Sequence, residues 1–171
     1  MISVVIECKN QEQPLAVTLA ALVQGAVEGL VAEVIVIDLG STDDTEKLAD
    51  AAGCRFLLNP DIRETVRNAR GEWLLLVEPG ARPLLGWVEH LHQHIASGQK
   101  AARFSRSRDY RLPFLARIKH RHSALEHGVL MTKRQAIANA RSGKSVESLA
   151  RGVTMQKLKC EIVSAAVLGI A

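Results

Sequence analysis

The chain has 171 residues, of which 47% are hydrophobic and 23% are charged, a balance typical of a globular protein. This length predicts a single domain, residues 1–171, large enough to bury roughly 70% of the surface of the unfolded chain. The formal net charge is +4, but no pattern of a nucleic-acid-binding module occurs, so we expect no nucleic-acid partner.

The predicted elements alternate between strands and helices from the first residues onward. Short apolar runs predict buried strands, and longer stretches with apolar residues at helical spacing predict helices. We expect strands at 3–7, 33–38, 54–58, 72–78, 100–105, 128–133 and within 157–165, and helices at 14–27, 41–53, 59–71, 84–98, 134–141 and 145–151.

Two of these helices carry specific expectations. Ser41 and Thr42 are candidate caps at the start of the helix 41–53, because Ser and Thr side chains accept hydrogen bonds from free N–H groups there. In the helix 84–98, Leu85, Val88 and Leu91 recur at helical spacing and predict its buried face.

Strands that alternate with helices predict an α/β fold with a mostly parallel sheet. The strand 72–78 is apolar almost throughout, as expected at the centre of a sheet that is covered on both faces. Ligands of such sheets bind beyond the carboxyl ends of the strands, near a topological switch point. Asp38 and Glu78 each end a predicted strand, so we expect both at the ligand-binding edge.

Three segments follow one another in an order that is more specific than any of them alone. They are SVVIECKNQEQPLAVTLAALV (3–23), EVIVIDLGSTDDT (33–45) and ARGEWLLLVEPGARPLLGW (69–87). Together they resemble the family 2 glycosyltransferases with the GT-A fold, over about residues 2–90. Fainter matches to the same family follow at EHGVLMTKRQAI (126–137) and SVESLARGV (145–153).

The resemblance implies a Rossmann-like GT-A fold, a three-layer α/β sandwich with a mostly parallel central sheet. It also implies transfer of a sugar from a UDP- or GDP-type nucleotide-sugar donor, usually with Mn2+ or Mg2+. A divalent ion held by carboxylates stabilises the charge that develops on the diphosphate leaving group. An inverting transferase also needs a carboxylate that takes the proton from the acceptor hydroxyl.

By this resemblance, the ends of the first two strands hold the nucleotide. Asp38 matches the acid that holds the nucleoside, and Asn10 matches a residue after the first strand. Gly40 and Ser41 match the turn that follows Asp38. The alternative for Asp38 is a cap of the next helix, and the alternative for Gly40 and Ser41 is a plain strand–helix turn.

Two further nucleotide-binding candidates depart from the family pattern. Glu7 stands where members tend to have proline, and a carboxylate at the mouth of a nucleotide pocket would need a cation such as Lys9 or Arg70 beside it. Arg70 is also a candidate phosphate clamp, because guanidinium groups match phosphate geometry. The alternative is an ordinary surface arginine.

The metal motif of the family is incomplete in this chain. Glu78 aligns with its first acid, whereas Gly80 stands at the second, which usually contacts the metal. Magnesium typically combines one or two carboxylates with phosphate and water oxygens, so Glu78 is a doubtful metal ligand that needs further oxygen ligands. The alternative is an acid exposed at a Pro-Gly turn.

Glu126 and Glu147 are the alternative candidates for the catalytic base. Glu126 precedes the GVLMTK segment, and Glu147 lies in the SVESLAR segment, and both match acidic positions of the family. Otherwise each is a solvated acid.

The run 100–122 holds eight Lys and Arg residues against one Asp. It predicts either a solvated basic face or contact with an anionic acceptor, including one at a membrane surface. The scattered cysteines suit a reducing cytoplasm, and we see neither a signal peptide nor an apolar run long enough to span a bilayer. We therefore expect a cytoplasmic protein, at most peripheral to the inner membrane face, and leave a homodimer open.

Three functions remain possible from the sequence. The first is an inverting glycosyltransferase acting on an unknown acceptor. The second is a catalytically inactive relative with a degraded metal motif, a pseudoenzyme that serves as a binding or scaffolding module. The third is a metal-independent transferase in which basic side chains replace the ion.

Overall fold

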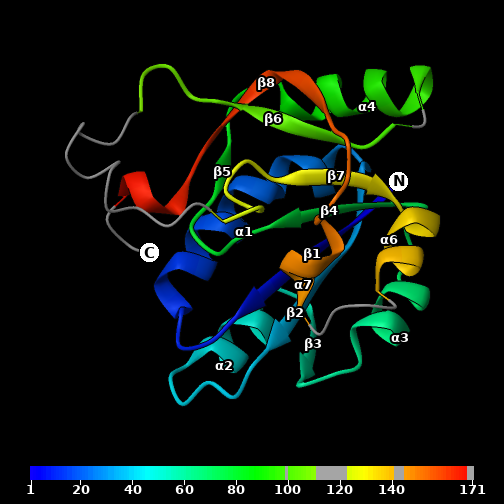
Figure 1. Cartoon of the computed structure of the whole chain (residues 1–171). Helices are drawn as coiled ribbons and strands as arrows, with labels where there is room; N and C mark the ends of the chain where they lie inside the picture. The colour runs from blue at the N-terminus through cyan, green and yellow to red at the C-terminus, as the bar shows by residue number, and fades with distance from the viewer. Residues whose placement is uncertain (99, 111–122, 141–144, 169–171) are drawn as a thin grey trace.

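The computed structural model describes residues 1–98, 100–110, 123–140 and 145–168. Helices cover both faces of one central sheet (Figure 1). Its strands are β1 (Ile2–Cys8), β2 (Val31–Asp38), β3 (Arg55–Leu58), β4 (Trp73–Val77), β5 (Arg82–Pro83), β6 (Ala102–Arg106), β7 (Val129–Thr132) and β8 (Gln156–Val163). The described helices are α1 (Glu12–Val27), α2 (Thr45–Ala51), α3 (Ile62–Arg67), α4 (Trp87–Ser97), α6 (Lys133–Asn139) and α7 (Val146–Leu149), with a 3₁₀ helix, η1 (Ala165–Leu168).

The strand order across the sheet is β3-β2-β1-β4-β7-β6-β8-β5. The strands β1 to β4 pair in parallel, and β6 pairs in parallel with β8. The strand β7 is antiparallel to both β4 and β6, and β5 is antiparallel to β8. The predicted α/β fold with a mostly parallel sheet is therefore confirmed.

Two apolar cores lie on opposite faces of the sheet and make the molecule three-layered. Alternate residues of β4 supply both, because side chains alternate across a strand: Leu75 belongs to one core and Leu74 to the other. The helices α1, α2 and α4 cover the first core, and α3, α6 and α7 cover the second. This explains why β4 is apolar without interruption.

Two glycines of the segments that resemble the family are required by close packing. A Cβ atom at Gly71, just before β4, would lie 2.4 Å from the backbone nitrogen of Ser3 in β1. A Cβ atom at Gly25 of α1 would lie 2.5 Å from the ring of Trp87, which begins α4. Only glycine allows the chain to lie so close to the Ser3 backbone and to the Trp87 ring.

Three helix starts were predicted too early, at 41, 59 and 84, because α2 begins at Thr45, α3 at Ile62 and α4 at Trp87. The helix α2 begins at Thr45, so Ser41 and Thr42 do not cap it and instead lie in the preceding loop. The helix α4 begins at Trp87, so Leu85 precedes it and is 91% exposed rather than buried. The two-residue strand β5, which closes the far edge of the sheet, was not predicted.

The topology places a switch point between β1 and β4. The chain adds β2 and β3 on one side of β1 and then returns to add β4 on its other side. The crevice expected at such a point lies beyond the carboxyl ends of these strands.

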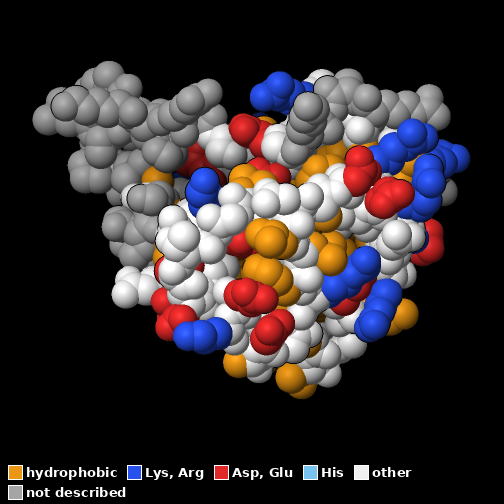
Figure 2. Space-filling model, turned by 90° about the horizontal axis from the view of Figure 1, so that it is seen from below, with side chains coloured by type: hydrophobic (Ala, Val, Ile, Leu, Met, Phe, Trp, Pro, Cys, Tyr) orange, Lys and Arg blue, Asp and Glu red, His pale blue; other side chains and the backbone are white. Residues whose placement is uncertain are grey.

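The edge strand at the β2 side is β3, and Leu58 at its end is 62% exposed. Seen from below, this side of the molecule shows hydrophobic side chains near its centre with charged ones around them (Figure 2).

None of the helices in the described ranges is long and apolar enough to cross a membrane. Residues 111–122, which make up half of the basic run 100–122, lie outside the described residues.

Candidate active site

The carboxyl edge of the sheet gathers most of the acids singled out from the sequence. Glu7 is near the end of β1, Asp38 ends β2, and Glu78 follows β4. Glu126 precedes β7, which runs in the opposite direction to β4, so it lies at the same edge. Glu147 belongs to α7, whose N-terminus contacts Glu7. The fold thus brings five predicted site residues to one edge.

Asp38 is 2% exposed and is surrounded by donors from its own turn. One carboxylate oxygen accepts hydrogen bonds from the backbone N–H of Gly40 at 3.0 Å and of Ser41 at 2.8 Å. The other oxygen accepts a bond from the Ser41 hydroxyl. Gly40 has a φ of +88°, a conformation that favours glycine and that this turn requires. Asp38 therefore holds the turn that follows β2.

Asn10 and Ser41 join the loop after β1 to the loop after β2. The backbone N–H of Asn10 donates to the Ser41 hydroxyl at 2.8 Å. The Asn10 side-chain oxygen accepts a bond from the backbone N–H of Thr42 at 2.7 Å. These contacts explain why the sequence motif pairs these residues, since each loop is built on the other.

Glu7 has a structural partner that the sequence did not indicate. Its carboxylate accepts a hydrogen bond from the backbone N–H of Val146 at 2.8 Å. Val146 is the first residue of α7, where N–H groups lack partners within the helix. Glu7 thus attaches α7 to the end of β1.

Glu78 is the acid whose protonation the structure alters most clearly. Burial and the negative charges of Glu126 and Glu147 raise the pKa of Glu78 to about 7, although a hydrogen bond from the Ala165 N–H opposes the shift. That bond to the Glu78 carboxylate is 3.3 Å long. The end of β4 and the segment before β7 lie at the same edge of the sheet, and Glu147 bonds to that segment, so the charges of both acids act on Glu78. We call Glu78, Glu126 and Glu147 the acid group.

Glu126 is held inside the protein by a cation. Its side chain is 1% exposed, and its Oε1 lies 3.1 Å from Nη2 of Arg106, the last residue of β6. Arg106 lies within the basic run 100–122, for which one predicted alternative was a solvated face. That alternative is wrong for Arg106. Its buried Nε has no hydrogen-bond partner among the described residues. No sequence motif identified this residue.

Glu147 supports the segment that carries Glu126. Its Oε1 accepts a hydrogen bond from the backbone N–H of Ala124 at 3.0 Å. The two alternative base candidates are therefore physically connected through the loop before β7.

The turn after Glu78 explains the missing second metal acid. Gly80 is buried with a φ of +93°, and its N–H donates both to the carbonyl of Pro14 at 2.9 Å and to the Thr18 hydroxyl at 2.8 Å. An aspartate there would be strained, because L-residues rarely adopt this conformation. In the described ranges, no group of three or more His, Cys, Asp or Glu residues has a metal-binding arrangement. The described side chains thus do not form a metal centre by themselves.

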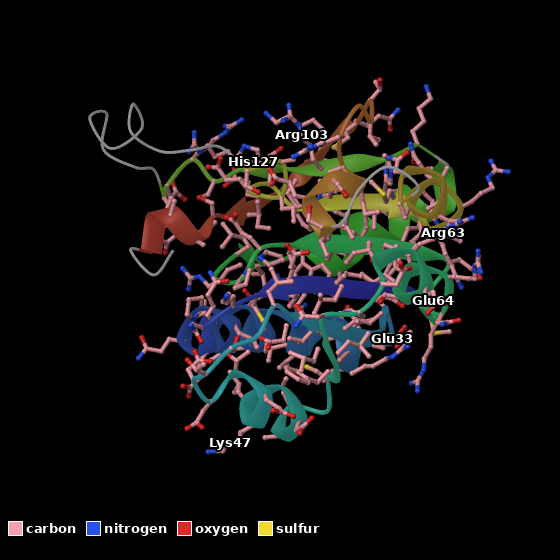
Figure 3. The ribbon with its side chains drawn as sticks, turned by 60° about the horizontal axis from the view of Figure 1, so that its bottom comes forward. Glu33, Lys47, Arg63, Glu64, Arg103 and His127 are labelled. Carbon is pink, nitrogen blue, oxygen red and sulfur yellow. The ribbon has the colours of Figure 1, made fainter. Side chains whose placement is uncertain are left out.

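Arg70 lies at the amino ends of the parallel strands, opposite the carboxyl ends where the acid group lies. We therefore correct its assignment to the nucleotide site. Its backbone N–H donates to Glu33 at 2.5 Å, and its Nε lies 3.9 Å from the same carboxylate. Glu33 is near the start of β2 and lies on the right of Figure 3, whereas His127, the neighbour of Glu126, lies on the left. Arg70 precedes β4, so its strand carries it away from the acid group.

Comparison with known proteins identifies both a family and a fold. The sequence model of Glycosyl transferase family 2 matches residues 3–145. No curated protein matches the chain significantly.

Three solved structures illustrate the similarity. Glucosyl-3-phosphoglycerate synthase from Mycobacterium tuberculosis, in complex with Mn2+, UDP and glucosyl-3-phosphoglycerate, has a TM-score of 0.62 at 22% identity, over 92% of this chain and 69% of that chain. The UDP complex of the same enzyme has a TM-score of 0.56 at 23% identity, over 80% of this chain and 58% of that one. A mycobacterial protein has a TM-score of 0.55 at 22% identity, over 80% of this chain and 54% of the other.

These similarities confirm the GT-A fold that the sequence motifs implied. The chain spans only 57–58% of the length of the first two synthase structures, so much of those proteins has no counterpart in it.

Proposed function

Because this chain belongs to glycosyl transferase family 2, we propose that it transfers a sugar from a nucleotide-diphosphate donor to an acceptor hydroxyl. The observation that carries the proposal is the acid group at the switch point between β1 and β4. Sugar transfer with inversion needs a carboxylate to take the acceptor proton, and this edge of the sheet offers three candidates.

The donor would lie against the loops after β1 and β2. Asn10, Asp38, Gly40 and Ser41 stay as proposed nucleotide contacts, because they form one hydrogen-bonded wall at this edge. The side-chain oxygens of Asp38 are engaged within the turn, so its proposed role is to hold the wall in shape. Glu7 stays a proposed contact near the end of β1, where its carboxylate also accepts the N–H of Val146 in α7.

The base is proposed to come from the acid group. Glu126 and Glu147 keep the role that the sequence predicted for them, since Glu126 precedes β7, which pairs with β4, and Glu147 bonds to the same segment. The pKa of about 7 also equips Glu78 to accept a proton near neutral pH, where general bases work best. Binding a metal ion would not by itself require Glu78 to accept a proton near neutral pH.

Metal dependence is the part of the proposal most open to test. The similar synthase structures include complexes of UDP with Mn2+ and of UDP with Mg2+. In this chain Glu78 is the carboxylate at the corresponding strand end, and Gly80 supplies no side-chain ligand. A divalent ion would therefore rely on diphosphate oxygens beside Glu78.

Calorimetric titration of UDP and of GDP, with Mn2+, with Mg2+ and with a chelator, tests the proposal. We expect one nucleotide to bind, and Glu78→Gln to remove any increase in affinity that the metal causes. Glu72→Gln is the matched control, because Glu72 is exposed at the other end of the same strand. Failure of both nucleotides to bind under every condition would favour the inactive binding or scaffolding module.

The other partners are proposals as well. An anionic acceptor would suit the basic composition of residues 100–122. A homodimer would find an unpaired strand edge at β3, which ends at the exposed Leu58. A cytoplasmic location remains a prediction from the sequence.

A further inference from the structure

The strands β6 and β8 have one face in the core and one face outside it. Phe104 of β6 and Leu158 and Cys160 of β8 are buried in the core that α4 covers. Side chains alternate along a strand, so the residues between these point the opposite way. The outer residues are Arg103, Ser105, Lys157, Lys159 and Glu161.

This outer side is basic and largely unpaired. Arg103 and Lys157 are register partners across the two strands, and both are exposed, as is Lys159. None of these three cations forms an ion pair with a residue in the described ranges. Figure 3 shows Arg103 on the outer side of these strands, far from Lys47.

Glu161, the acid on the outer side of β8, is already paired with a cation. Glu161 accepts a hydrogen bond from the backbone N–H of Arg108 at 3.1 Å, and Nε of Arg108 lies 3.8 Å from the same carboxylate. We call Arg103, Arg108, Lys157 and Lys159 the basic face. Arg108 is thus paired with Glu161, and Asp109, the residue after Arg108, is a second exposed acid.

A shallow hollow of about 380 Å³ opens within the basic face. Its lining includes Ser105, Arg108, Lys157 and Lys159. The cations are donors that a phosphate group accepts from, whereas the Ser105 hydroxyl already donates to the carbonyl of Leu158, and Glu161 also lines the hollow. The hollow therefore suits a phosphate that approaches from outside the sheet.

We propose that the basic face binds the surface of an anionic phospholipid bilayer. Long cationic side chains, of which Arg103, Lys157 and Lys159 form no ion pair within the described ranges, attract lipid phosphates, and each contributes roughly fivefold to binding. Single-stranded nucleic acid is disfavoured, because it usually needs aromatic rings for stacking. Near the basic face the described residues include Tyr110, which is 47% exposed, and Arg82 lies over one face of its ring, with its guanidinium carbon 5.9 Å from the ring centre.

The basic face reaches the candidate active site. Arg106, at the end of β6, contacts Glu126, and Arg108 follows two residues later. A bilayer bound here would present its headgroups beside the acid group. The inference goes beyond the proposed function, because attraction to lipid needs neither a nucleotide nor catalysis.

Vesicle co-sedimentation tests this inference directly. The purified chain is mixed with vesicles of phosphatidylcholine alone, or of phosphatidylcholine with phosphatidylglycerol, at low and high salt. We expect binding only to the anionic vesicles, weakened by salt, and a decrease of about 25-fold in the Lys157→Gln, Lys159→Gln double variant. These exposed positions tolerate glutamine without loss of the fold, which circular dichroism checks.

The matched control is Lys47→Gln with Arg67→Gln, which changes the net charge equally on α2 and α3. This control should bind nearly as the wild type does. An equal decrease in both double variants would overturn the proposal, because net charge alone would then explain binding. Absence of wild-type binding to anionic vesicles would also overturn it, as would binding to an oligonucleotide in place of vesicles.

Discussion

At the scale of single residues, Glu78 shows how position changes the chemistry of a carboxyl group. It stands at the end of the central strand β4, partly buried, with two other acids nearby. A surface glutamate at a Pro-Gly turn, the alternative drawn from the sequence, would keep its ordinary pKa near 4.5. The neighbourhood instead raises the pKa of Glu78 to about 7.

This shift predicts a pH dependence of stability. In the folded protein Glu78 keeps its proton up to about pH 7, whereas in the unfolded chain it loses the proton near 4.5. Between these values the folded state binds more protons, so the contribution of Glu78 to stability falls as the pH rises and stays low above pH 7. Glu78→Gln removes this penalty and should gain roughly 1–3 kcal/mol over wild type at high pH.

Urea unfolding at about pH 5 and about pH 8 measures the effect. The difference in unfolding free energy between Glu78→Gln and wild type should increase with pH. Glu72→Gln, at the exposed start of the same strand, should show no such increase. A constant difference for Glu78→Gln would contradict the raised pKa.

At the scale of elements, short helices depend on side chains from other parts of the chain. The helix α7 has only four residues, too few to be stable alone. Ser145 caps it by accepting a hydrogen bond from the Ser148 N–H, and Glu7 of β1 accepts another from Val146. Apolar burial of Val146 and Leu149 completes its attachment to the sheet.

Glu7→Ala should therefore lower the free energy of unfolding by about 1 kcal/mol, the usual cost of losing an acceptor at a helix N-terminus. Glu7→Gln should retain most of the stability, since the amide oxygen still accepts the Val146 N–H. Hydrogen exchange at the Val146 amide reports the contact itself, and it should accelerate in the alanine variant alone. Unchanged exchange there would show that the contact does not hold α7.

At the scale of the whole molecule, the two-sided core dominates stability. The sheet is buried where β1 and β4 pair, and helices from both halves of the chain close over it (Figure 1). The leucines of residues 72–85 therefore differ greatly in importance although they are chemically the same.

Leu75→Ala should destabilise the protein by about 2–5 kcal/mol, because it leaves a cavity in the centre of one core. Leu85→Ala should change stability by less than about 0.5 kcal/mol, because Leu85 is 91% exposed. Urea unfolding compares the two variants directly. Similar losses in both would mean that the exposed Leu85 is buried by a contact that the isolated chain lacks.

Much of the fold followed from the sequence because its signals are local. Continuous apolar runs marked β1, β2 and β4, and their alternation with helices marked the parallel sheet. Asp38 and Glu78 could be placed at one edge because carboxyl ends of parallel strands meet there. Helix starts were less certain, since Ser41 bonds to Asn10 from another loop rather than to its own helix.

By itself, the sequence determined the α/β class, the family and the acids at the strand ends. Only the tertiary structure decided which charges meet: Arg106 joined Glu126, Glu7 joined α7, and Arg70 was carried to the far edge. The physical reason is the distance along the chain over which each signal acts. Apolar periodicity and turn residues act over a few neighbours in the chain, whereas ion pairs and pKa shifts depend on distances that only the packed sheet sets.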